Sequence, residues 1–196
     1  MSTATLRRAG WAGLLAAALF VTSTAINQIA PVQTPYVSTS DYVHQAVLLV
    51  GFLAVVGAVV GVTALLRSTG RMGALSAIGG LLTGVSYFFI AVLTLVNLLL
   101  GERSLVAVRQ AAALVLLVGS ALLGVLVLIT RVLPWWCGVL LIVAFPLGDV
   151  ADTLFRGGEG LLFALLWGTV GVALLRRAGA AAEPARAADR QPQVVR

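Results

Sequence analysis

Six long apolar runs, separated by short gaps, constrain this chain more than any other feature. Charged residues gather in the gaps, near the ends of the runs and at the two ends of the chain. Most of the runs approach or exceed the ~20 residues that an α-helix needs to cross a bilayer. The runs therefore predict an all-α fold, a polytopic membrane protein built as a six-transmembrane-helix bundle. The predicted spans are roughly residues 11–30, 43–66, 73–100, 111–130, 135–154 and 156–175.

The composition excludes a soluble protein. Of the 196 residues, 60% are hydrophobic and only 10% are charged, whereas a soluble domain has about 25% charged residues. Six spans and their loops use nearly the whole chain, so we expect a single transmembrane domain over residues 1–177. Residues 178–196 combine few large apolar side chains with two prolines and mixed charge, so we expect a disordered cytoplasmic tail there.

Missing residue types exclude several kinds of site. All 13 basic residues are arginine, so no lysine can form a Schiff base or serve a phosphate-binding loop. Cys137 is the only cysteine and His44 the only histidine. One chain therefore cannot form an intramolecular disulfide, a Cys-x-x-Cys redox pair or a multi-histidine metal or haem site. We expect no cofactor and no metal site, and membrane lipids rather than nucleic acid as partners.

The arginines predict the orientation of the bundle, because cytoplasmic loops carry an excess of basic residues. Ten arginines fall on the side that holds both termini, and three fall on the opposite side. The first group is Arg7, Arg8, Arg67, Arg71, Arg131, Arg176, Arg177, Arg186, Arg190 and Arg196, and the second is Arg103, Arg109 and Arg156. We therefore expect both termini in the cytoplasm (N-in/C-in). The alanine, valine, leucine and arginine bias resembles that of high-GC bacteria, which predicts a multi-pass protein of a bacterial plasma membrane.

The first run permits a second interpretation, a cleaved signal peptide. Arg7 and Arg8 precede an apolar stretch, and residues 23–25 (Ser-Thr-Ala) could serve as the cleavage site. Cleavage would leave five spans and an N-terminus outside the cell. Polar but uncharged residues follow Val21 and can continue a helix, so we favour the intact span.

Small residues predict how the helices pack. Gly57 and Gly61, like Gly80 and Gly84, have the Gly-xxx-Gly spacing that lets two membrane helices approach closely. We favour packing within one chain over a dimer interface. In the third run, small and hydroxylated residues recur every three or four positions and predict an interior helix face. They are Ser76, Gly80, Thr83, Tyr87, Ala91 and Thr94.

Polar residues collect at the predicted outer ends of the spans, and ionisable groups partly within a membrane usually face the bundle interior. Asp149 and Asp152 lie three residues apart and share a helix face, and Pro146 just before them removes a backbone hydrogen bond. The candidate ligand-binding residues are Asn27, His44, Asn97, Asp149, Asp152 and Arg156. The candidate catalytic residues are His44, Asp149, Asp152 and Glu159.

Several functions fit these residues. The leading hypothesis is a non-enzymatic membrane protein that binds or passes an amphipathic or ionic ligand at an outward-facing polar pocket. One alternative is an intramembrane enzyme acting on a lipid or isoprenoid substrate, with Asp149 or Asp152 as the acid and His44 as its partner. Another is a structural subunit of a membrane complex or a homo-oligomer. In the simplest interpretation the polar residues lie in the headgroup layer, and Arg156 neutralises Asp152.

Overall fold

The computed structural model describes residues 2–70, 72–101 and 105–189, with side chains as far as residue 182. All regular structure in these residues is helical, and each of the six helices is long and apolar enough to cross a membrane. The prediction of an all-α, six-helix membrane bundle is confirmed. The helices are α1 (Thr3–Ile29), α2 (Thr39–Arg67), α3 (Gly73–Leu100), α4 (Val106–Thr130), α5 (Trp135–Leu154) and α6 (Gly158–Asp189).

Polar caps explain why two of the helices begin before their apolar runs. The hydroxyl of Ser2 accepts a hydrogen bond from the Thr5 N–H at the start of α1. At the start of α2, Ser38 and Asp41 form a capping box, in which each side chain bonds to the other residue's backbone. Capping satisfies the N–H groups that a first helical turn leaves without partners. Hydropathy alone therefore places these starts several residues too late.

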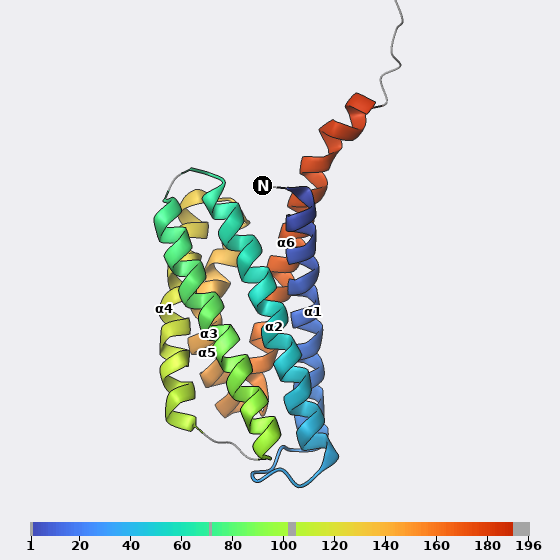
Figure 1. The fold of residues 1–196 in the computed structure, drawn as a ribbon, viewed down its shortest axis with the longest axis vertical. Helices are drawn as coiled ribbons and strands as arrows, with labels where there is room; N and C mark the ends of the chain where they lie inside the picture. The colour runs from blue at the N-terminus through green and yellow to red at the C-terminus, as the bar shows by residue number, and fades with distance from the viewer. Residues whose placement is uncertain (1, 71, 102–104, 190–196) are drawn as a thin grey trace, which may run out of the picture.

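The last helix extends beyond the predicted span. α6 continues to Asp189, through the first part of the segment for which we predicted disorder, and it projects past the rest of the bundle (Figure 1). Ala178 in this segment is buried, and alanine has the highest helix propensity. Residues 190–196 lie outside the described residues, as do Arg71 and Arg103.

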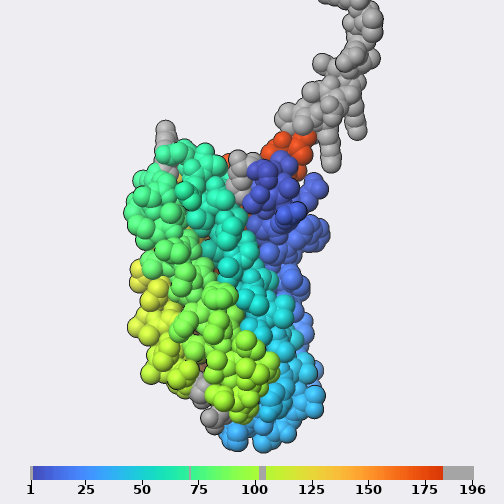
Figure 2. Space-filling model, viewed as in Figure 1, coloured from blue at the N-terminus to red at the C-terminus, as the bar shows by residue number. Residues whose placement is uncertain are grey.

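The helices form a closed ring. Each helix packs against its neighbours in sequence, and α6 packs against α1 to close the ring, while α2 also contacts α4 and α6 across the centre. Side chains of α1, α2 and α3 lie against one another over one face (Figure 2). The N-terminal end of α1 and the C-terminal end of α6 lie at the same end of the bundle (Figure 1). We call this the arginine end, for Arg7, Arg8, Arg67, Arg131, Arg176 and Arg177, and the opposite end the carboxylate end, for Asp41, Asp149, Asp152 and Glu159.

Glycines allow the backbones of α1 and α6 to touch. A Cβ atom added at Gly171 would lie 2.8 Å from the Gly10 carbonyl oxygen and 2.9 Å from the Leu14 nitrogen. A Cβ atom at Gly13 would lie 2.8 Å from the Trp167 carbonyl oxygen. Only glycine permits this approach, because the obstructing atoms belong to the backbone of the neighbouring helix.

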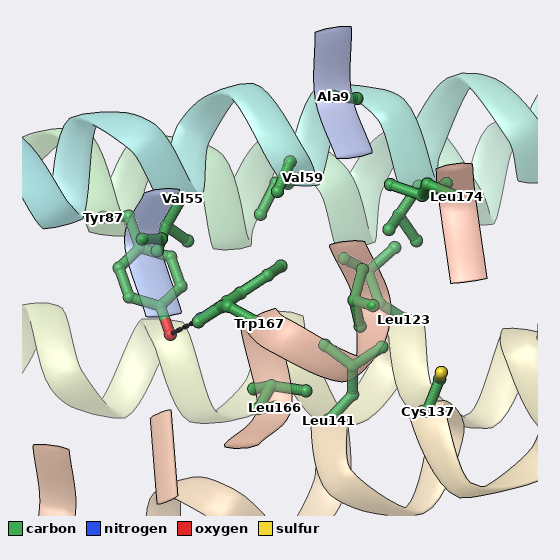
Figure 3. Close-up of a cluster of buried hydrophobic side chains, with 14 of the residues drawn as sticks. Ala9, Val55, Val59, Tyr87, Leu123, Cys137, Leu141, Leu166, Trp167 and Leu174 are labelled. Atoms are coloured by element: carbon green, nitrogen blue, oxygen red, sulfur yellow. Dashed lines mark hydrogen bonds between the residues drawn. The ribbon is translucent and has the colours of Figure 1, made fainter. Parts of the chain in front are cut away.

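The predicted Gly-xxx-Gly pairs also pack within the chain. Gly61 lies directly against Ala9 of α1, and Gly80 lies directly against Thr63 of α2. All six residues of the predicted α3 stripe are buried, so the prediction of an interior face is confirmed. At the centre, Trp167 donates a hydrogen bond of 3.4 Å from Nε1 to the Tyr87 hydroxyl (Figure 3).

The α1–α6 contact can be tested with two substitutions on α6. We expect Gly171→Ala to lower the free energy of unfolding by about 1–3 kcal/mol, because overpacking against backbone atoms forces the helices apart. Gly179 has no atom within 4 Å of its added Cβ, so Gly179→Ala should leave stability unchanged or raise it slightly. Thermal unfolding in detergent micelles measures both. Equal melting temperatures for the two variants would contradict the close contact.

Candidate functional site

Two adjoining cavities occupy the carboxylate end. The first, which we call the end cavity, has a volume of about 180 Å³ and is lined by residues of α1, α2, α4, α5 and α6 and of the α5–α6 turn. The second, the side cavity, has a volume of about 560 Å³ and lies among residues of α2 to α6. Both cavities are lined by Phe52, Arg109, Glu159 and Phe163. Together, the two cavities are therefore lined by residues of all six helices.

Glu159 stands at the junction of the two cavities because glycines surround it. A Cβ at Gly148 of α5 would lie 3.0 Å from the Glu159 Cγ, so α5 can lie directly against the glutamate side chain. A Cβ at Gly158 would lie 2.5 Å from the backbone carbonyl of Ala151, and Gly160 lies directly against Thr24 of α1. The first turn of α6 thus fits between α1 and α5, and it carries Glu159 into the bundle.

Hydrogen bonds fix the turn that precedes Glu159. The Gly157 N–H donates to Oδ1 of Asp152 over 2.8 Å, and the Thr24 hydroxyl donates to the Gly157 carbonyl over 3.2 Å. The Gln28 amide donates to the Arg156 carbonyl. Gly157 has a φ of +80°, a backbone conformation that favours glycine. Side chains of α1 and α5 therefore hold the α5–α6 turn in place.

Acidic side chains outnumber basic ones among the residues that line the two cavities. Arg109, in the first turn of α4, interacts attractively with Glu159, while Asp149 and Asp152 interact with it repulsively. Arg109 lines both cavities, Asp149 lines the side cavity and Asp152 lines the end cavity. Three acidic side chains and one guanidinium group thus line the two cavities, and the exposed Arg156 lies in the adjoining α5–α6 turn.

Two adjacent residues of α2 add buried polar groups to the end cavity. His44 is 6% exposed and Gln45 is 2% exposed, and both line the cavity. Within the described part of the chain, Oε1 of Gln45 has no hydrogen-bond partner. A buried acceptor of this kind costs free energy unless a donor reaches it. Gln45 therefore places a buried acceptor without a described partner beside the end cavity.

Aromatic rings form the inner wall of both cavities. The centroid of the Phe20 ring lies 5.5 Å from that of Phe52 and 5.6 Å from that of Phe163. The Phe163 ring also packs against Phe145 and Tyr87, which line the side cavity. The polar groups thus lie on one side of an aromatic layer, and the apolar core lies on the other.

The structure distributes the predicted site residues among different environments. Asn27, His44 and Asp152 line the end cavity, Asp149 lines the side cavity, and Glu159 lines both. Of the two predicted acids of an enzymatic pair, Asp152 therefore lines the same cavity as His44, whereas Asp149 faces the other cavity.

The remaining predictions concern Asn97 and the pairing of Arg156. Asn97 is buried in α3 but is not among the residues that line either cavity. The Arg156 side chain is exposed, and no ion pair joins it to Asp152 among the described residues. Pro146 lies inside α5, which continues as a helix to Leu154.

Sequence reasoning did not select Arg109, Gln45 or the phenylalanines that line the cavities. Arg109 had a detectable signal, since an arginine in the first turn of a span lies closer to the membrane than one in a loop. Gln45 had a weaker signal, as a second polar residue next to His44. Phe20, Phe52 and Phe163 had none, because phenylalanine is common in any membrane helix.

Asp41 belongs to the same end but serves a structural role. Its carboxylate is fully buried and accepts hydrogen bonds from the backbone N–H groups of Gln33 (3.1 Å), Val37 (3.0 Å) and Ser38 (2.9 Å). These bonds fold the α1–α2 loop back over the start of α2. Asp41 does not line either cavity, so it organises the loop beside the site.

The chemistry available at this end comes from the residues themselves. No group of three or more histidine, cysteine, aspartate or glutamate side chains within the described residues could hold a metal ion. No protein family, curated protein or solved structure matches this chain. A function must therefore be argued from the shape, charge and lining of the two cavities.

The role of Asp41 predicts a difference between carboxylates. We expect Asp41→Asn to lower the free energy of unfolding by about 1–3 kcal/mol, because the amide would turn a donor toward backbone N–H groups that need an acceptor. Asp149 is exposed, so Asp149→Asn should change stability by less than about 0.5 kcal/mol. Thermal unfolding of both variants measures this difference. The proposed role of Asp41 is wrong if the Asp41→Asn variant has the same melting temperature as the unsubstituted protein.

Proposed function

We propose that this protein binds an amphipathic small molecule at the carboxylate end. The observation that carries the proposal is the junction of two unlike cavities at Glu159 and Arg109. The polar end cavity suits a charged or hydrogen-bonding head, and the larger side cavity, lined mainly by apolar residues, suits an apolar body. A volume of about 560 Å³ falls within the range of about 300–1,000 Å³ that is typical of small-molecule sites.

The charge balance favours a cationic head. Asp149, Asp152 and Glu159 outnumber Arg109, and the rings of Phe20, Phe52 and Phe163 lie beside them. Aromatic faces attract amines and quaternary ammonium groups by roughly 0.5–2 kcal/mol each. A carboxylate next to an aromatic layer is therefore well suited to an organic cation.

The side cavity supports entry from the bilayer. Two of its lining residues on α4, Val106 and Leu114, are 55% and 66% exposed on the apolar surface. An amphipathic ligand concentrates at the membrane interface, so a lateral opening allows it to enter without leaving the lipid. Passage through the protein is less well supported, because Trp167, Leu123 and Leu141 fill the centre beyond the aromatic layer (Figure 3).

Binding is better supported than catalysis. His44 and Asp149 line different cavities, and one oxygen of Asp152 is engaged by the Gly157 N–H. The enzymatic alternative would need His44 to act with Asp152 or Glu159 in the end cavity. Chemical conversion of a bound native lipid that is lost in Asp152→Asn would support that alternative instead.

A pair of isosteric probes tests the binding proposal. Tetraphenylphosphonium and tetraphenylborate have nearly the same size but opposite charge. We expect saturable binding of the cation to the purified protein in maltoside micelles, weakened at least tenfold by Glu159→Gln. Tenfold corresponds to about 1.4 kcal/mol, a reasonable value for one charge pair near a protein surface.

Arg109→Gln is the matched control, because it removes a charge of the opposite sign from the same junction. We expect it to strengthen binding of the cation severalfold and to weaken binding of the anion. Equilibrium dialysis measures both affinities. Two results would contradict a cation site. One is binding of the cation that does not saturate, and the other is an equal loss of affinity for the cation in Glu159→Gln and Arg109→Gln.

We also propose that the arginine end faces the cytoplasm and the carboxylate end faces outward, in the plasma membrane of a bacterium. The excess of arginine at one end supports this orientation through the positive-inside rule. Val37 lies in the α1–α2 loop and is 67% exposed, and Ser68 is exposed at the other end.

Cysteine labelling tests the orientation, with Cys137→Ala as the background. We expect an impermeant maleimide to label Val37→Cys in intact cells, and to label Ser68→Cys only after the membrane is permeabilised. The opposite pattern would reverse the orientation.

A further inference from the structure

A third cavity lies at the arginine end of the bundle, whereas the site described above lies at the carboxylate end. It has a volume of about 790 Å³ and lies among the end of α4, the α4–α5 connection, the start of α5 and residues 173–180 of α6. Three arginines line it: Arg131, Arg176 and Arg177. Trp135 lines it as well, and no aspartate or glutamate is among its described lining residues.

We propose that this cavity binds an anionic phospholipid. Guanidinium groups pair with phosphate oxygens through two parallel hydrogen bonds, and three of them in one cavity match a phosphate diester. The remaining wall is apolar, with Leu128, Val132 and Leu133, and can accommodate the first part of an acyl chain. Basic pockets between transmembrane helices are suited to anionic lipid headgroups, and tryptophan is suited to the same interfacial depth.

The backbone at Arg131 shows how its side chain can be removed without straining the turn. Arg131 ends α4 with a φ of +52°, and its N–H donates to the Val127 carbonyl over 2.9 Å. Helices that end in this left-handed conformation usually place glycine there, because a Cβ atom makes it unfavourable. The fold alone would therefore be better served by glycine. The arginine therefore adds a positive charge to the cavity that the turn itself does not require.

Two other arginines at the same end provide a comparison. Arg7 and Arg8 lie on α1 and are exposed, as Arg131, Arg176 and Arg177 are, but they do not line this cavity. They contribute to the general positive charge of the arginine end without sharing the enclosed site. Specific binding must therefore depend on Arg131, Arg176 and Arg177 more than on Arg7 and Arg8.

Native mass spectrometry of the full chain in maltoside micelles tests the proposal. The probes are dioleoylphosphatidylglycerol, dioleoylphosphatidylcholine and inorganic phosphate. We expect the anionic lipid to bind at least tenfold more tightly than the zwitterionic lipid. Arg131→Gly should weaken binding of the anionic lipid about fivefold, and Arg176→Gln with Arg177→Gln should weaken it further.

Arg131→Gly also controls for folding, since glycine suits the backbone at this position. The melting temperature of the lipid-free variant should equal or exceed that of the unsubstituted protein, so that a lost lipid does not report a damaged fold. The double variant Arg7→Gln with Arg8→Gln should bind the anionic lipid within twofold of the unsubstituted protein.

Three results would overturn the proposal. The first is unchanged affinity for the anionic lipid in Arg131→Gly. The second is an equal loss in the variant of Arg7 and Arg8, which would indicate diffuse charge rather than a site. The third is displacement of the lipid by millimolar inorganic phosphate, which would assign the cavity to free phosphate.

Discussion

Backbone contact between α1 and α6 is the interaction on which the rest of the structure depends. In a bilayer, lipid tails solvate an apolar helix as well as another helix does, so close packing must supply the association. Gly10, Gly13 and Gly171 remove the side chains that would separate the two helices. Their contact closes the ring and joins the last helix to the first. Since α6 also packs against α5, ring closure determines where Glu159 lies relative to the other five helices.

The carboxylate end departs from what stability alone would favour. Glu159 lies close enough to Asp149 and Asp152 of α5 to be repelled by both, and Oε1 of Gln45 is buried with no partner among the described residues. Each such group costs free energy, of order 1–3 kcal/mol for a buried polar atom without a hydrogen bond. Proteins retain such costs mainly at functional sites. The aromatic layer beneath these groups confines them to one end, so that the rest of the bundle can pack as an ordinary apolar core.

Hydropathy was sufficient to predict the helices but not the site. The number of helices, the limits of α3 and α5 and the buried stripe of α3 followed from apolar length and periodicity, because these are properties of single segments. The starts of α1 and α2 depended on capping by Ser2 and Ser38, which hydropathy does not register. The junction at Glu159 and Arg109 depended on how α4, α5 and α6 pack together. That information resides in contacts between distant glycines and backbone atoms, and no local pattern contains it.

The two ends of the bundle are complementary in a way that bears on the orientation. A cavity lined by three arginines suits anionic lipid, and the cytoplasmic leaflet carries a negative surface potential from such lipids. A cavity with an excess of carboxylates suits a cation and gains nothing from that leaflet. The positive-inside rule predicts a cytoplasmic arginine end from charge counting alone. The proposed anionic-lipid site would favour the same orientation, and it depends on three of the same arginines, Arg131, Arg176 and Arg177. We therefore expect the charge segregation in this chain to influence two properties, the direction of insertion and the class of ligand that each end of the bundle would bind.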